Sequence, residues 1–171
     1  MSQAAANPTR VNVRNADRRD LHFQTLAEAV DDVRRLSTVD LRTTGNRSPT
    51  SLVEHLAHAI TIYVDGIDPG IIPLPVRVLA MPIRSLLRKR FCFGPMPAGA
   101  KNPRKIESAF YPDRLNTFDQ AAEAFGDAVA RLEATETMPH HPVLGTMTKH
   151  EVEQLHCRHA ELHLSFIHPT D

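Results

Sequence analysis

Apolar residues recur every three or four positions in four segments of the chain, which is the spacing of one face of an α-helix. In the clearest segment these positions are Phe118, Ala121, Ala122, Phe125, Val129 and Leu132. Each segment opens with a hydroxyl residue followed three positions later by Glu or Gln, a pair that can cap the free N–H groups at a helix start. The pattern predicts helices over residues 25–36, 51–65, 117–134 and 148–167. Since no segment alternates as a half-buried strand does, we expect an all-α fold, a four-helix bundle.

The remaining segments set the domain boundaries. Residues 1–20 are polar and are expected to form a flexible tail before a single domain over residues 21–168, since 171 residues suit one buried core. Between the second and third helices, residues 69–106 hold seven of the thirteen prolines, eight Lys or Arg, and no Asp or Glu. Within this stretch we expect a helix over residues 76–91, kinked before Pro82, and otherwise an irregular crossover.

The basic crossover allows three interpretations. We favour a solvated connection whose charge is balanced by the acidic helices around it. A phosphate or membrane-surface site is the functional alternative. In a third interpretation, one or two of its cations steer an anionic substrate towards a site in the bundle.

Charge and cysteine content limit the binding partners and the cellular location that we expect. The 20 basic and 20 acidic side chains cancel, so no global field attracts nucleic acid or an anionic membrane, and neither is expected as a partner. The N-terminus lacks the apolar stretch of a secretory signal, and the two cysteines do not form a CxxC pair. A reducing, cytoplasmic location is therefore expected, with Cys157 as an ordinary reduced residue.

Histidine is the unusual component, with ten residues against two tyrosines and no tryptophan. His159 and His163 are four residues apart, so their imidazoles lie one turn apart on the same face of the fourth helix, close to His156. That face also carries Val152, Leu155 and Phe166, and we therefore expect it to face the core. Glu153, Arg158 and Glu161 are expected to lie away from it.

The second helix supplies a complementary histidine. His55 shares an inward stripe with Leu52, Ala59 and Ile62, and His58 lies at the edge of that stripe. Three neutral imidazoles from facing helices form a common metal site in bundles and leave a position open for water or substrate. The spacing thus predicts a divalent metal held by His55, His159 and His163, with His58 and His156 as neighbours that orient ligands or transfer protons. The alternative is a set of core histidines satisfied by hydrogen bonds alone.

The run RHAELHLSF at residues 158–166 resembles the closing motif of a DinB-like branch of unknown function. Four further motifs agree with that branch: Arg18-Arg19 before Leu21 and Phe23, Thr43-Thr44-Gly45-Asn46 before His55-Leu56-Ala57, Met96-Pro97-Ala98-Gly99, and His141-Pro142 before Gly145. The resemblance extends over residues 16–168. It departs from the branch at Arg47 and near Val152, where tryptophan is usual.

The resemblance implies a DinB/YfiT-like bundle of four long helices, often dimeric, with His55, His159 and His163 as metal ligands. Characterised members of the wider superfamily include thiol-dependent transferases and isomerases, such as bacillithiol transferases and maleylpyruvate isomerase. The resemblance therefore implies a metal that ionises a low-molecular-weight thiol or a water.

We expect a metal-dependent enzyme of the thiol S-transferase or hydrolase type acting on a small molecule. Imidazole ligands favour zinc or nickel, and iron or copper also fit. The alternatives are a non-catalytic metal- or ligand-binding stress-response bundle, as a homodimer, and a structural bundle without metal.

Overall fold

The computed structural model describes residues 10–99 and 109–170. Its helices are α1 (Leu26–Leu36), α2 (Pro49–Asp65), α3 (Leu74–Ala80), α4 (Arg84–Phe93), α6 (Phe118–Ala134) and α7 (Lys149–Leu164). Short 3-10 turns lie at Pro69–Ile71 and Met81–Ile83, and β1 (Leu41–Thr43) pairs with β2 (Ile167–Pro169). The protein is therefore mostly helical, as the apolar spacing predicted.

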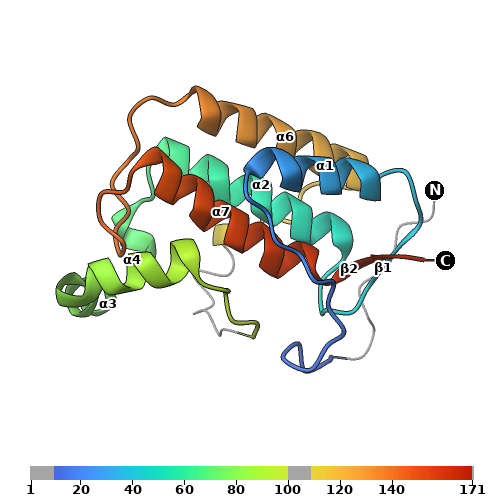
Figure 1. The fold of residues 1–171 in the computed structure, drawn as a ribbon, viewed down its shortest axis with the longest axis horizontal. Coiled ribbons are helices and arrows are strands. Elements are labelled where there is room, and N and C mark those ends of the chain that lie inside the picture. Colours follow the sequence, from blue (N-terminus) through green and yellow to red (C-terminus); the bar gives the residue numbers. More distant parts are fainter. Residues whose placement is uncertain (1–9, 100–108, 171) are drawn as a thin grey trace.

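The long helices pack around a shared core (Figure 1). Helix α2 contacts both α6 and α7, while α1 contacts α6 and α7 from the other side. Their apolar faces meet at fully buried side chains that include Leu26, Ile60, Phe125 and Leu164. Burial of these faces is the main favourable term for the fold and places α2 directly beside α7.

Helix starts follow the predicted caps in three of four cases. The hydroxyls of Thr25, Thr117 and Thr148 accept the expected backbone N–H bonds at the starts of α1, α6 and α7. The prediction for α2 was wrong, because Ser48 caps that helix and Pro49 is its first residue. A proline suits this position because its missing N–H would have had no partner in the first turn.

The expectation of no strand was also wrong, as was the extension of the last helix to residue 167. Helix α7 ends at Leu164, and the chain continues into β2, which runs antiparallel to β1 with Leu41 opposite Pro169 and Thr43 opposite Ile167. Strands of three residues are too short to show an alternating pattern, so the sequence carries no signal for them.

The packed domain starts earlier than residue 21, which corrects the expected extent of the tail. The Arg18 Nε donates to Ser165 Oγ at 2.8 Å, and the Arg19 guanidinium forms a two-bond ion pair with Asp32. Further out, the side chain of Asn46 bonds both backbone groups of Val11. The expectation for residues 1–9 lies outside the described part of the chain.

This N-terminal segment also explains why Arg158 was misplaced by the sequence pattern. Arg158 is 6% exposed, although we expected it on the outer side of the last helix. Its guanidinium pairs with Glu161 at 2.9 Å and donates to the Phe23 carbonyl, and Phe23 N–H donates to Glu161 at 2.6 Å. The segment before α1 therefore covers a polar face of α7 and satisfies it with hydrogen bonds.

The crossover contains the predicted broken helix. Helices α3 and α4 are separated by the Met81–Ile83 turn, which includes Pro82. The rest of the crossover as far as Gly99 is described, and its predicted continuation through residues 100–106 falls outside the described ranges. Within the described ranges, no helix combines the length and the apolar character that crossing a bilayer requires.

Candidate metal centre

Three histidines converge where α2 faces α7. Nitrogens of His55, His159 and His163 all lie within 4.8 Å of one another, and the Nε2 atoms of His55 and His159 are 3.0 Å apart. Nitrogens that ligate one zinc at about 2.0–2.1 Å are themselves about 3 Å apart, so only a small adjustment brings this set into a ligand geometry. The predicted set of ligands is thus brought together by the fold, and it fits a divalent metal.

A backbone carbonyl fixes the tautomer of His55. The Nδ1 of His55 lies 2.7 Å from the Phe110 carbonyl oxygen, which can only accept, so Nδ1 carries the proton. The lone pair of this ring is therefore on Nε2, the atom that points at His159. Metal-ligating histidines are commonly oriented by such a bond from their other nitrogen.

The carbonyl belongs to a segment, residues 109–115, that lies along α2 and that we call the strap. Its Ala109 carbonyl accepts from His58 Nε2 at 3.0 Å. Further along, the buried carboxylate of Glu54 accepts the backbone N–H groups of Arg114, at 2.9 Å, and Leu115, at 3.3 Å. Glu54 thus holds the strap from the position just before His55. The sequence did not indicate this role, because Glu54 stands three residues after Ser51, which is the spacing of a helix cap.

The strap also supplies an aromatic wall. The ring of Tyr111 stacks on His55 with centroids 4.0 Å apart and planes 8° apart, and the Arg47 guanidinium lies 3.6 Å from the centre of Tyr111. Arg47 reaches Asp113 at 3.4 Å as well. Arg47 thus takes part in a stack over His55, where its charge is attracted to the face of the Tyr111 ring.

Burial keeps the three imidazoles neutral. It lowers the pKa of His55 to about 4, although the Phe110 carbonyl acts in the opposite direction. Burial also holds the pKa values of His159 and His163 well below their ordinary range, and the neighbouring imidazoles add to this effect. Neutral imidazole is the form that offers a lone pair to a metal.

The two other candidate histidines lie beside the centre and outside the ligand set. His58 bonds the strap, as described above. His156 is 6% exposed, packs its ring 5.7 Å from that of Tyr63, and leaves its Nε2 without a hydrogen-bond partner in the described structure. His58 therefore orients the strap, whereas His156 is a core residue next to the site.

Neither buried thiol joins the histidine cluster. Burial raises the pKa of Cys157 to about 12 and that of Cys92 to about 11, which disfavours the thiolate that metals bind. The interpretation of Cys157 as a reduced, unligated residue agrees with this environment.

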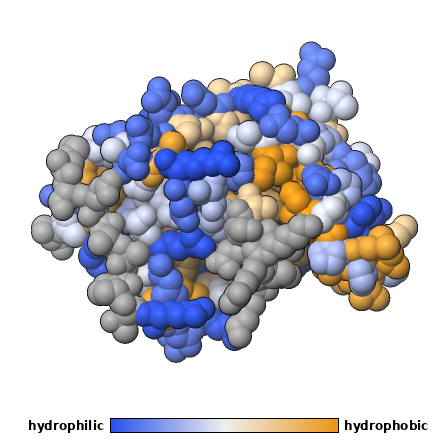
Figure 2. Space-filling view, turned by 180° about the vertical axis from the view of Figure 1, so that it is seen from behind, coloured by the Kyte–Doolittle hydropathy of each residue, from blue (hydrophilic) through white to orange (hydrophobic). Residues whose placement is uncertain are grey.

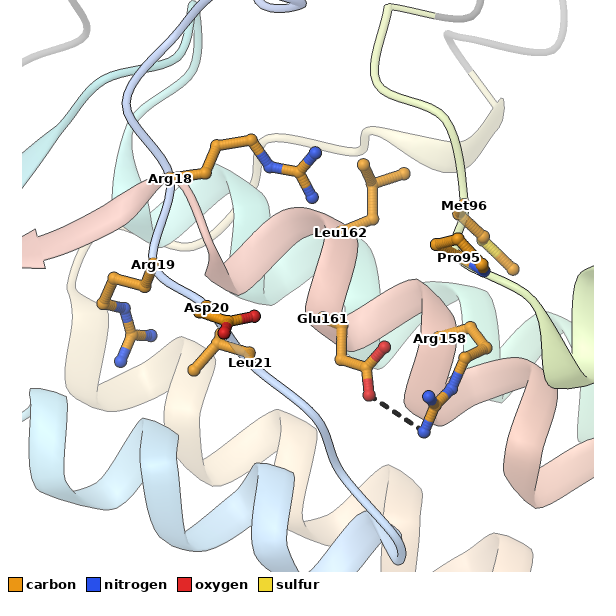
Figure 3. A pocket seen from close by; sticks show the side chains of 9 residues that line it. All are labelled: Arg18, Arg19, Asp20, Leu21, Pro95, Met96, Arg158, Glu161 and Leu162. Carbon is orange, nitrogen blue, oxygen red and sulfur yellow. Dashed lines mark ion pairs between the residues drawn. The ribbon is translucent and has the colours of Figure 1, made fainter.

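Two cavities border the helices that carry the three histidines. The larger, about 350 Å³, opens between the N-terminal segment, α7 and the Pro95–Met96 turn, and its lining includes Arg18, Asp20 and Leu162 (Figure 3). The smaller, about 200 Å³, lies between α2 and the strap and is lined in part by Glu54 and His58. None of the three histidines lines either cavity.

A family model described as "Protein of unknown function (DUF1569)" matches residues 15–170. No curated protein and no solved structure matches the chain. The match includes the three histidines, the strap and the N-terminal segment from residue 15 onwards.

Proposed function

The chain belongs to the DUF1569 family, whose description assigns no function, and from its site geometry we propose that it is a divalent-metal-dependent enzyme. The main support for this proposal is the convergence of three neutral imidazoles, with the His55 tautomer fixed by the Phe110 carbonyl. A set of three neutral ligands leaves the positive charge of the metal uncompensated, so a bound thiol or water would ionise near neutral pH. Imidazole ligands suit zinc and nickel, which we propose here, and iron and copper also fit.

The proposal includes membership of the DinB/YfiT-like superfamily, with α1, α2, α6 and α7 as the four helices of its bundle. The reaction we propose is thiol S-transfer or hydrolysis on a small molecule in the cytoplasm. His55, His159 and His163 would hold the metal, and the strap would keep His55 oriented. Tyr111 covers one face of His55, and His159 and His163 are only partly exposed, which favours a compact nucleophile, such as a low-molecular-weight thiol or water, over a macromolecular substrate.

Metal content tests this proposal directly. We expect close to one zinc or nickel per chain in untagged protein purified without chelator, and little in a His159→Ala/His163→Ala variant, measured by plasma mass spectrometry. The matched control is His140→Ala/His150→Ala, which removes two exposed histidines and should keep the metal. Loaded protein would then be assayed for thiol transfer and hydrolysis. A parent protein that takes up neither metal when offered them would leave a structural bundle with hydrogen-bonded histidines.

Replacing Glu54 by Gln should weaken metal binding by about ten- to a hundredfold, the usual effect of losing a residue that orients a ligand. The carboxylate accepts three hydrogen bonds from the Arg114 and Leu115 N–H groups, whereas the amide has a single accepting oxygen, no charge and an N–H₂ that cannot accept, so the strap and its Phe110 carbonyl should loosen. Competition with a chromophoric chelator measures the affinity. Glu123→Gln, on the exposed side of α6, is the control, and equal affinities in all three proteins would contradict the role of Glu54.

A further inference from the structure

The exposed apolar side chains of the protein gather on one projecting element. We call residues 74–93, which form α3, the Met81–Ile83 turn and α4, the arm. Of the nine large apolar residues that are exposed in the described ranges, eight are in the arm: Leu74, Val76, Val78, Leu79, Met81, Ile83, Leu86 and Phe93. Isolated exposed apolar residues are ordinary, whereas a contiguous group marks a contact surface.

Among the described residues, the main contact of the arm with the rest of the protein is made by one side of α4. Helix α4 packs its inner face on α7, where Cys92 is fully buried and Arg88 pairs with Glu151 at 3.1 Å. Helix α3 lies beyond it and projects from the other helices (Figure 1). Figure 2 shows the molecule from behind, and hydrophobic residues gather in the corresponding region of that view. With Leu79 73% and Leu86 67% exposed, the outer side has no partner among the described residues.

Cations are interleaved with the apolar residues on this outer side. Leu86, Lys89, Arg90 and Phe93 follow one another at helical spacing on α4, and all four are exposed. No Asp or Glu occurs anywhere between residues 69 and 106, so the arm has no carboxylate of its own to neutralise Lys89 and Arg90. The surface is therefore both apolar and positively charged, although the chain as a whole is neutral.

The positive charge of the arm distinguishes between its two simplest binding partners, a second copy of the chain and a lipid bilayer. A two-fold dimer through this surface would place the same patch against itself and bring Lys89 and Arg90 towards their own copies without a counter-charge. An anionic bilayer supplies both complements, since its acyl boundary accepts apolar side chains and its headgroups pair with cations. No helix of the described ranges could cross the bilayer, so the arm would lie in its interface.

We propose that the outer side of the arm, through Leu79, Leu86, Lys89 and Arg90, binds the surface of anionic lipid bilayers. This departs from the expectation of no membrane contact, which rested on net charge alone. The arm is a separate surface from the histidine centre, so the two proposals stand or fall independently.

Vesicle flotation tests the inference with the full chain. We expect binding to vesicles of equal parts phosphatidylcholine and phosphatidylglycerol, little binding to phosphatidylcholine alone, and release as salt is raised. Leu79→Ser/Leu86→Ser should lower the partition coefficient on the order of tenfold by removing buried apolar area. Lys89→Gln/Arg90→Gln should lower it by about tenfold or more, since each cation near an anionic surface contributes separately. Unchanged circular dichroism and an unchanged thermal unfolding midpoint would show that the variants remain folded.

The control is Arg34→Gln/Arg131→Gln, which removes two exposed cations from α1 and α6 and changes net charge equally. This variant should bind vesicles as the parent does. If it lost as much binding as Lys89→Gln/Arg90→Gln, the binding would depend on net charge and not on the arm. A parent that stays unbound with anionic vesicles overturns the proposal. So does self-association in sedimentation velocity that Leu79→Ser/Leu86→Ser abolishes while vesicle binding is absent, because the occupant would then be a second copy.

Discussion

Lowering the pH from 8 to 5 should remove about 4 kcal/mol from the free energy of unfolding through His141 and His156 alone. Burial lowers the pKa of His156 to about 3 and that of His141 to about 4. Both rings are therefore neutral in the folded protein at pH 5, whereas an unfolded histidine, with a pKa of about 6.5, is mostly protonated there. Each buried neutral ring then favours the unfolded state by about 2 kcal/mol.

The sign follows from proton counting. Below pH 6.5 the unfolded chain binds more protons than the folded chain at these two sites, so stability rises with pH. The contribution is absent above the unfolded pKa and grows as the pH falls towards the folded values near 4 and 3. Urea unfolding of chelator-treated protein at pH 8, 6 and 5 measures the effect.

His156→Leu isolates one of the two groups. Leucine has a similar volume and removes a buried Nε2 that has no partner in the described structure, so stability at pH 8 should change little. Between pH 6 and 4 the variant should lose about 1.4 kcal/mol less per pH unit than the parent. Identical pH profiles for the two proteins would show that His156 is not buried in its neutral form.

Asp32→Ala should destabilise the protein by about 3–5 kcal/mol, because it breaks a buried ion pair and leaves a cation without its partner. The Asp32 side chain is 5% exposed and binds both amino groups of Arg19, at 2.9 and 2.6 Å, as well as Arg35. Burial by itself would raise the pKa of this carboxyl, but the bonds and charges of Arg19 and Arg35 outweigh it and lower the pKa. Arg19 also donates to the Leu164 carbonyl, so the pair joins the N-terminal segment, α1 and the end of α7.

The adjacent residue provides the control. Asp31 pairs with Arg34 at 3.4 Å, but both side chains are more than 70% exposed, so Asp31→Ala should change stability by less than about 1 kcal/mol. Denaturant unfolding at pH 7 compares the three proteins. The carboxylate contribution of Asp32 is present above its unfolded pKa and is lost only as pH falls through the lower folded value, which separates it from the histidine effect. Similar losses for Asp31→Ala and Asp32→Ala would contradict the ion-pair argument.

The features that depend on local spacing could be predicted from the sequence. Helices α1, α6 and α7 start at the predicted caps because a hydroxyl three residues before a free N–H is a local arrangement. The inward positions of His55, His159 and His163 followed from helical periodicity in the same way, and so did the break at Pro82.

Contacts between distant segments could not be predicted from the sequence and depend on how the helices pack. Glu54 had the spacing of a helix cap, yet its carboxylate bonds Arg114 and Leu115, 60 residues or more along the chain. Arg158 had the periodicity of an outer position, yet the N-terminal segment buries it. The same holds for the pairing of β1 with β2 and for the stack of Arg47 on Tyr111. A polar side chain has several possible partners of similar strength, and its choice depends on which segments the packed helices bring within reach, which local periodicity does not encode.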